Sequence, residues 1–311
     1  MKPNLLILGL LLPVLSLSSH SYANLVSKYL LYPDQTEPDS ELIRRNQLQW
    51  DYAQNSYLTK KQHFFTGERI KYEGIEYYHF KSIPKSDRSP DHRVTVLYFT
   101  GNAGGASYGS PWQDLYPLNW EVDEWTVSYP GFSGSDGKPD IKSIPKFSEK
   151  AFRFVESWHR SECDFQNCQR PFLIAGYSLG TSVALSLGKN KPATGLLLYN
   201  PPAFPDILHL HVSQVVGSCL QAFASPLIWF NFPGSLNSVE AAKVNHKPSV
   251  IISGSRDEIA PPSNQQQLID SYKGLKSVFR IDYMGHIPEP VRSQKTKEAI
   301  RESMEALVSG L

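Results

Sequence analysis

The sequence predicts an α/β protein in which helices cover both faces of a mostly parallel sheet. Short apolar runs that read as buried strands recur along the chain, at residues 93–99, 125–129, 194–200, 249–253 and 277–283. Segments with helical periodicity or small residues separate several of these runs, as the crossovers of a parallel sheet require. A further apolar run leads directly into Gly176-Tyr177-Ser178-Leu179-Gly180 and then into a small-residue segment that reads as a helix.

The remaining elements follow from periodicity and turn residues. Two candidate strands at residues 68–72 and 75–80 flank the turn dipeptide Glu73-Gly74, which is typical of a hairpin. Residues 144–159 and 293–308 each carry apolar side chains at helical spacing on one face.

Composition is that of an ordinary globular protein. The chain has 311 residues, of which 41% are hydrophobic and 20% are charged, and its net charge is +1. This is enough apolar material for the core of one α/β domain. Near-neutral charge without a basic run gives no reason to expect a nucleic-acid partner.

The N-terminus predicts a signal peptide at residues 1–23. A positive end at Lys2 precedes the apolar stretch 5–17, and the small residues Ser21 and Ala23 fit a cleavage site. The alternative is a retained anchor, but the apolar stretch is shorter than the roughly 20 residues of a spanning helix. We therefore expect a single domain at residues 24–311, exported to the periplasm or secreted, with no stable membrane span after cleavage.

Export to an oxidising compartment makes a disulfide plausible. Cys163 and Cys168 lie close together after the helix predicted at 144–159, and their spacing differs from that of Cys-x-x-Cys metal or redox sites. The sequence favours a bridge between them, and two unpaired thiols at a helix end are the alternative. Cys219 would remain unpaired.

The segment between the strands at 194–200 and 249–253 is longer than one crossover helix needs. It contains apolar residues at roughly helical spacing, and the apolar run 227–230 includes Trp229 and Phe230. We interpret residues 204–245 as a small helical cap in which Trp229 and Phe230 contact substrate, since ligand pockets are mostly apolar. A longer crossover helix with a loop, entirely buried as core, is the alternative.

The pentapeptide around Ser178 predicts a nucleophile elbow. A strand that turns sharply into a helix exposes the serine at the turn, and flanking glycines allow the two elements to approach closely. A serine hydroxyl needs a base and an orienting carboxylate. The loops after the strands 249–253 and 277–283 supply Asp257 and His286 in the required order, with Glu258 as the rival acid.

Backbone donors for a developing oxyanion are also expected. One is the N–H of Leu179, and the other comes from the glycine-rich turn after Phe99, at Asn102 or Ala103. This turn lacks the glycine and lysine spacing of nucleotide-binding loops. No His, Cys or Asp cluster in the sequence has metal-ligand spacing.

Taken together, these motifs resemble the α/β-hydrolase superfamily. The resemblance rests on residues 101–104, Gly131-Phe132-Ser133-Gly134 and the residues that follow to Pro139, the pentapeptide at 176–180, Asp257, and Gly285-His286. The chain is most similar to the serine aminopeptidase-like branch, which also holds small esterases and protein depalmitoylases. The resemblance implies an eight-stranded sheet with one antiparallel strand, a Ser–Asp–His triad and no cofactor. Thr100 and Pro130 depart from residues common in that branch.

The sequence therefore predicts an exported serine hydrolase that cleaves carboxylic esters or thioesters through an acyl-enzyme. Its partner would be a small-molecule or lipid-like acyl substrate. A serine peptidase is the second enzymatic hypothesis, and a non-catalytic binding protein on a hydrolase scaffold is the third. The acyl group, the leaving group and the oligomeric state do not follow from the residues, because one fold hosts many substrates.

Overall fold

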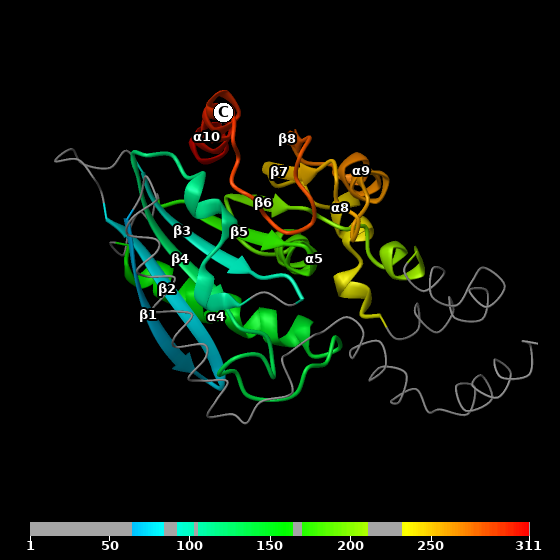
Figure 1. Cartoon of the computed structure of the whole chain (residues 1–311). Helices are drawn as coiled ribbons and strands as arrows, with labels where there is room; N and C mark the ends of the chain where they lie inside the picture. Colours follow the sequence, from blue (N-terminus) through cyan, green and yellow to red (C-terminus); the bar gives the residue numbers. More distant parts are fainter. Residues whose placement is uncertain (1–63, 84–91, 103–104, 164–169, 211–231, 311) are drawn as a thin grey trace, which may run out of the picture.

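The computed structural model describes residues 64–83, 92–102, 105–163, 170–210 and 232–310. Within them the chain forms one eight-stranded sheet (Figure 1). The strands are β1 (Phe64–Tyr72), β2 (Ile75–Ile83), β3 (His92–Phe99), β4 (Trp120–Val127), β5 (Phe172–Tyr177), β6 (Gly195–Tyr199), β7 (Ser249–Gly254) and β8 (Lys276–Ile281).

The strand order is β1-β2-β4-β3-β5-β6-β7-β8. The hairpin of β1 and β2 is antiparallel, β2 is antiparallel to β4, and every later pairing is parallel. The one antiparallel strand that the resemblance implied is therefore β2. Because β3 and β5 to β8 run in the same direction, their carboxyl ends lie at one edge of the sheet, where open α/β sheets place their sites.

Helices cover both faces of the sheet (Figure 1). They are α4 (Ile144–Ser161), α5 (Leu179–Gly188), α8 (Ser238–Lys243), α9 (Pro262–Ser271) and α10 (Gln294–Ser309), with short 3₁₀ segments η1 (Ala106–Tyr108), η2 (Pro111–Asp114) and η3 (Gly234–Leu236). One hydrophobic cluster joins the sheet to α4, α5, α8 and α9. The other joins its opposite face to η1, η2 and α10.

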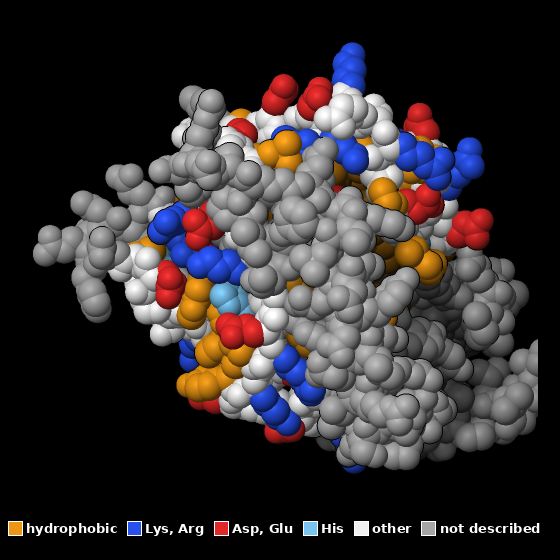
Figure 2. Space-filling model, turned by 60° about the vertical axis from the view of Figure 1, so that its left-hand side comes forward, with side chains coloured by type: hydrophobic (Ala, Val, Ile, Leu, Met, Phe, Trp, Pro, Cys, Tyr) orange, Lys and Arg blue, Asp and Glu red, His pale blue; other side chains and the backbone are white. Residues whose placement is uncertain are grey.

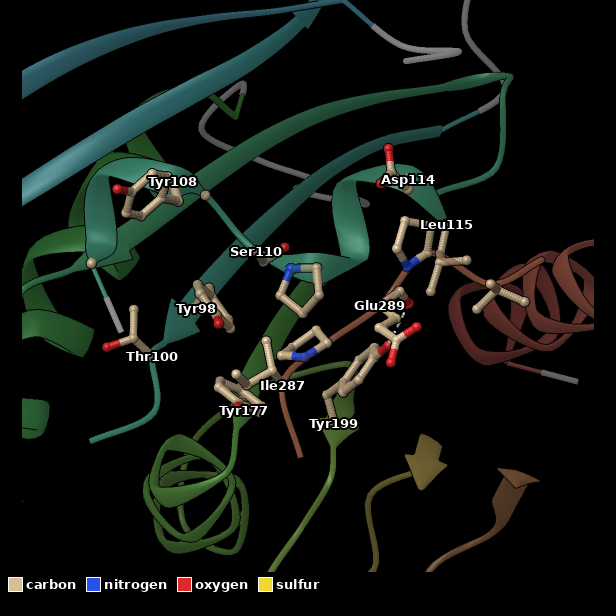
Figure 3. A pocket seen from close by; sticks show the side chains of 16 residues that line it. Tyr98, Thr100, Tyr108, Ser110, Asp114, Leu115, Tyr177, Tyr199, Ile287 and Glu289 are labelled. Atoms are coloured by element: carbon tan, nitrogen blue, oxygen red, sulfur yellow. Dashed lines mark hydrogen bonds between the residues drawn. The ribbon is translucent and has the colours of Figure 1, made fainter. Parts of the chain in front are cut away.

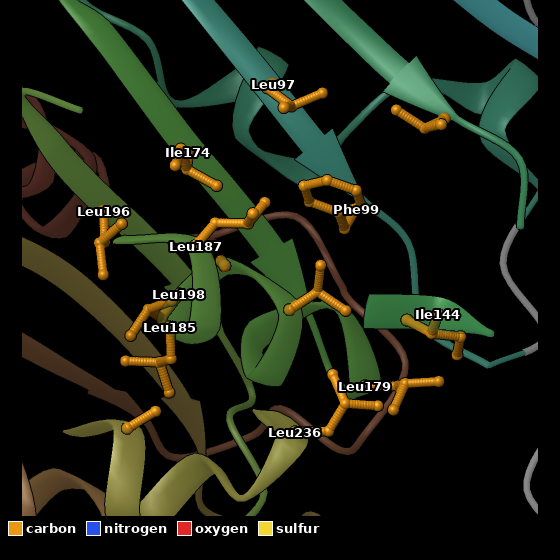
Figure 4. Packing of buried hydrophobic residues seen from close by; sticks show 14 of the residues in the cluster. Leu97, Phe99, Ile144, Ile174, Leu179, Leu185, Leu187, Leu196, Leu198 and Leu236 are labelled. Carbon is orange, nitrogen blue, oxygen red and sulfur yellow. The ribbon is translucent and has the colours of Figure 1, made fainter. Parts of the chain in front are cut away.

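The core beneath the carboxyl edge is built from alternating strand residues and from α5. Leu97, Phe99 and Ile174 project from β3 and β5 toward Leu179 and Leu185 of α5 (Figure 4). Helix α5 is buried almost all round because its sequence is short, small and apolar. A helix of this kind fits between the sheet and its neighbours, and it fixes the position of its own first turn.

The fold class and most predicted elements are confirmed. The hairpin turns at Glu73-Gly74, and the helices predicted at 144–159 and 293–308 correspond to α4 and α10. Three strand boundaries were wrong by more than two residues. β4 was expected at residues 125–129 but spans Trp120–Val127, β1 begins at Phe64 and not at residue 68, and β2 continues to Ile83 and not residue 80. The helix α9 was not predicted, because its first turn carries polar residues that are nevertheless partly or fully buried.

Several sequence predictions lie outside the described residues. These are the signal peptide at 1–23, Ala103, Cys168, and Trp229 and Phe230 within residues 211–231. At the end of the proposed cap, Leu236 and Ala242 belong to the core cluster beside α5. The cap itself stays a prediction.

The described surface agrees with the near-neutral net charge. On the face that Figure 2 shows, described acidic and basic side chains are interspersed. Among the described residues, no helix combines the length and apolarity needed to cross a bilayer.

Candidate active site

Ser178 occupies a strained turn between β5 and α5. Its backbone has φ 51° and ψ −120°, a conformation that L-residues rarely adopt. The two flanking glycines explain how the turn closes. A Cβ atom at Gly176 would overlap the carbonyl oxygen of Gly180, and one at Gly180 would overlap the carbonyl oxygen of Phe99. Strand and helix can approach this closely only with glycine at both positions.

Three predicted side chains meet at the carboxyl edge of the sheet. His286 follows β8, and its Nε2 atom lies 2.9 Å from the Oγ atom of Ser178. Asp257 follows β7, and its Oδ2 atom lies 2.8 Å from Nδ1 of His286. An N–H on Nδ1 that donates to Asp257 leaves Nε2 as the acceptor facing the Ser178 hydroxyl, which is the arrangement that general-base activation requires.

The structure distinguishes between the two candidate acids. Asp257 is 2% exposed, whereas Glu258 is exposed. The Oδ1 atom of Asp257 accepts the N–H groups of Ile259 and Ala260 at 3.0 and 2.7 Å. The Gln265 amide on α9 donates to Oδ2 at 2.9 Å. These donors fix the orientation of the carboxylate toward His286.

Two further residues, which sequence reasoning missed, hold the His286 loop. The Asn200 side-chain amide donates to the carbonyl oxygens of Gly285 and His286 at 3.0 and 2.7 Å. Its Oδ1 atom accepts the N–H of Gly254 at 2.8 Å, at the start of the loop that carries Asp257. The Tyr177 hydroxyl also donates to the His286 carbonyl, at 3.0 Å. The only sequence signal for Asn200 was its position at the end of a strand, because Asn tolerates a left-handed backbone there.

The Tyr177 hydroxyl is held in its donor form. Burial, and secondarily the negative charge of Asp257, raise the pKa of Tyr177 well above its ordinary value. The hydroxyl therefore keeps its proton over the whole physiological range and remains a donor to the His286 carbonyl.

The glycine-rich turn after β3 passes over the nucleophile. A Cβ atom built at Gly101 would lie 2.9 Å from the Tyr177 ring and 3.4 Å from the Cβ atom of Ser178. The Tyr129 hydroxyl anchors this turn by donating to the carbonyl oxygen of Thr100 at 2.9 Å. Asn102 therefore lies one residue beyond the point of closest approach, and Leu179 opens α5 on the other side of Ser178.

Two other sequence predictions concern metal ions and cysteines. Within the described parts of the chain, no group of three or more His, Cys, Asp or Glu side chains is arranged to hold a metal ion. Cys163 is disulfide-bonded, but Cys168 is outside the described residues, so their pairing stays a prediction.

Sequence comparison finds distant relatives of this chain. No model of a known protein family matches it. It is 27% identical over 195 residues to protein bem46 of Schizosaccharomyces pombe, a match that covers 61% of this chain and 60% of that protein. It is 25% identical over 183 residues to the α/β hydrolase domain-containing protein WAV2 of Arabidopsis thaliana, covering 56% of each. The chain thus spans less than two thirds of the length of these curated relatives.

Solved structures with the same architecture include hydrolases. A putative lipase from Acinetobacter baumannii AYE superposes with a TM-score of 0.54 at 16% identity, covering 89% of this chain and 99% of that one. The chain has the α/β-hydrolase fold. The acetyl xylan esterase from Paenibacillus sp. R4 has a TM-score of 0.54 at 17% identity, and the match covers 90% of this chain and 98% of that one. At 16% and 17% identity, the structural similarity shows a shared fold only.

Proposed function

We propose that this α/β hydrolase cleaves carboxylic esters or thioesters with Ser178 as the nucleophile. The observation that carries the proposal is the hydrogen-bonded series from Ser178 through His286 to Asp257, with distances of 2.9 and 2.8 Å. Both distances lie within the range in which a base activates a hydroxyl group. The strained backbone of Ser178 supports the same role, because strain of this kind concentrates at functional sites.

The acylation half of the reaction uses all three side chains. The Oγ atom of Ser178 attacks the carbonyl carbon of the substrate while Nε2 of His286 accepts the hydroxyl proton. Asp257 stabilises the resulting imidazolium and keeps its ring oriented. The tetrahedral intermediate then collapses, and its bond to the leaving oxygen or sulfur breaks. His286 returns the proton to that atom, which leaves as an alcohol or thiol.

Water completes the cycle by hydrolysing the acyl-enzyme. His286 removes a proton from the water as it attacks the ester carbonyl on Ser178, and then protonates Oγ as the carboxylic acid departs. In both halves the N–H groups of Leu179 and Asn102 would stabilise the oxyanion. Leu179 opens α5 directly after Ser178, and Asn102 follows Gly101, which lies close to Ser178. Every step uses this chain's own residues and needs no cofactor.

Export is a second part of the proposal. The charged end, apolar stretch and small residues of segment 1–23 support cleavage after Ala23, and a disulfide at Cys163 suits an oxidising compartment. Mass spectrometry of the exported protein tests both points. We expect a mature chain that begins at Asn24 and a Cys163–Cys168 bridge that resists alkylation until reduced.

A substrate panel tests the chemistry. Purified protein is assayed with matched esters, thioesters and aminoacyl amides, and we expect turnover of the first two to exceed that of the third. Ser178→Ala and His286→Ala should lose nearly all turnover. Asp257→Asn should be slow because the imidazole tautomer is no longer fixed, whereas Glu258→Gln should resemble the wild type.

The competing hypotheses give different results in this panel. Preferential cleavage of the aminoacyl amides would indicate a peptidase. Tight binding of a panel member without turnover would indicate a binding protein on a hydrolase scaffold. An inactive Glu258→Gln variant beside a normal Asp257→Asn variant would overturn the assignment of the acid.

A further inference from the structure

A cavity of about 430 Å³ lies on the η1–η2 side of the sheet (Figure 3). Its volume is in the range of small-molecule sites. Four tyrosines, three prolines and several aliphatic residues contribute to its lining. Tyr177 lines the cavity from the position before Ser178, and Ile287 lines it from the position after His286. The cavity is therefore lined by the chain neighbours of Ser178 and His286.

One wall of the cavity is held by a buried carboxylate. Glu124 on β4 is fully buried, and it accepts the N–H of Ser110 at 2.8 Å and the Gln113 amide at 2.8 Å. The hydroxyl of Tyr116 donates to it at 2.7 Å, and the hydroxyl of Ser110 also donates to it. These bonds tie η2 and its flanks to the sheet, so this wall is positioned before a ligand arrives.

The opposite wall is the loop that carries His286. The Tyr199 hydroxyl donates to the Glu289 carbonyl at 3.3 Å, and Asn200 and Tyr177 hold the loop at His286 itself. At the rim, Ile287 is 76% exposed and Tyr108 is 39% exposed. Two exposed apolar side chains at the mouth of an aromatic cavity give an entering apolar group surface to bury.

Charge narrows the class of ligand. Asp114 and Glu289, at one end of the cavity (Figure 3), are the only charged side chains among its described lining residues. Glu289 pairs with Arg292 at 3.0 Å. A ligand group that carries a carboxylate would therefore meet two carboxylates and no cation within the described lining. The lining favours an uncharged alkyl or aryl group.

The proton transfer by His286 indicates which part of the substrate binds in the cavity. In the proposed reaction, Nε2 of His286 must deliver its proton to the leaving oxygen or sulfur, so the leaving group lies on the His286 side of the scissile bond. The loop that follows His286, from Ile287 to Val291, lines the cavity. We propose that the cavity is the leaving-group subsite, and that it binds the uncharged apolar part of the alcohol or thiol. This inference rests on the proposed function, and it places a subsite outside the predicted cap.

The test varies the two halves of the ester separately. In one series the acyl group is acetyl and the alcohol runs from methanol to hexanol, and in the other the alcohol is methanol and the acyl chain lengthens. We expect kcat/KM of the wild type to rise about fourfold for each of the first methylenes added to the alcohol. The acetyl ester of 6-hydroxyhexanoate, which ends in a carboxylate, should be a poorer substrate than hexyl acetate.

Variants at the rim assign the effect to the cavity. Ile287→Ser and Tyr108→Ala should flatten the alcohol series while the slope of the acyl series persists. Leu275→Ser is the matched control, because Leu275 is 77% exposed and lies outside the cavity lining. Slopes compare substrates within one variant, so a general loss of activity cancels.

Two results would overturn the subsite. One is a flat alcohol series in the wild type while the acyl series is steep, and the other is an alcohol slope that neither rim variant changes. Failure of the proposed function looks different, since then no ester in either series is cleaved, or Ser178→Ala cleaves them as fast as the wild type.

Discussion

The side-chain amide of Asn200 donates a 2.7 Å hydrogen bond to the main-chain oxygen of His286. Asn200 follows β6 with φ 47°, is fully buried, and also accepts the N–H of Gly254. One side chain thus connects the loop of the candidate base to the strand that leads to the candidate acid. It touches neither reacting atom, so we regard it as a positioning residue.

Replacing Asn200 should reduce turnover more than binding. Asn200→Ala removes the two hydrogen bonds that its amide donates to the His286 loop, and a displacement of about 1 Å at a catalytic group costs on the order of 10²-fold in rate. We expect kcat to fall by about that factor, with KM nearly unchanged, in steady-state ester hydrolysis.

Asn245→Ala is the control for this prediction. Asn245 is equally buried and donates to the Leu185 carbonyl at 3.1 Å, away from the triad. Both variants should lose stability in urea, because each removes hydrogen bonds from a buried amide side chain to the backbone, but only Asn200→Ala should lose kcat. Equal effects of the two substitutions on kcat would show that Asn200 has only a structural role.

The glycines of the elbow provide a second prediction. Gly180→Ala places a Cβ atom against the Phe99 carbonyl oxygen, so the strand and the helix must separate or the turn must distort. We expect a destabilisation of about 1–3 kcal/mol, as for overpacked cores, together with loss of activity. Gly234→Ala is the control, because a Cβ there meets nothing within 4 Å. Chemical denaturation and ester turnover measure both quantities, and a fully active Gly180→Ala protein would contradict the close approach described here.

Acid stability depends in part on His159. Burial, followed by the charges of Arg170 and Arg160, lowers the pKa of His159 to about 4. Its Nδ1 atom lies 2.9 Å from the Thr95 hydroxyl, and its ring stacks on Phe172. The folded chain therefore keeps this ring neutral, whereas the unfolded chain protonates it near the ordinary value of about 6.5.

The sign of the effect follows from that difference. Protons bind the unfolded chain first, so the contribution of neutral His159 to stability is complete above about pH 6.5 and is lost as the pH falls toward 4. His159→Gln should show a smaller loss of unfolding free energy between those pH values, and the exposed His246→Gln should show the wild-type loss. An unchanged pH slope in His159→Gln would argue against a neutral buried ring.

The buried carboxylate of Asp123 provides a fourth prediction. Burial alone would raise its pKa, but the hydrogen bond from His79 and the charge of Arg170 outweigh that effect and hold the pKa below its ordinary value. Arg170→Met would leave the carboxylate buried with less compensation, and we expect a loss of about 3–5 kcal/mol. The double variant Asp123→Leu with Arg170→Met should recover part of that loss. A double variant no more stable than Arg170→Met alone would contradict this explanation.

Much of the fold could be predicted because its signals are local. Apolar runs mark β3, β5, β6 and β7. The two glycines of the pentapeptide around Ser178 indicate a sharp turn with close approach of strand and helix. The order of Asp257 and His286 after successive strands then places both side chains at the edge that carries Ser178. These inferences need only strand direction and chain order.

The missed features depend on partners distant in sequence. The part of β4 that was missed, residues 120–124, contains Asp123 and Glu124. They are buried only because His79, Arg170, Ser110, Gln113 and Tyr116 supply their hydrogen bonds or charges. Similarly, Gln265 makes the polar start of α9 part of the site by donating to Asp257. Residue type alone indicates a solvated segment in both cases.

Trapping of the acyl-enzyme tests the central claim most directly. The protein is mixed with a p-nitrophenyl ester, quenched in acid during the first turnovers, digested and analysed by mass spectrometry. We predict that the peptide containing Ser178 gains the mass of the acyl group in place of a proton, and that Ser178→Ala shows neither the adduct nor turnover. Acylation at another residue, or sustained ester hydrolysis by Ser178→Ala, would contradict the assignment of Ser178 as the nucleophile.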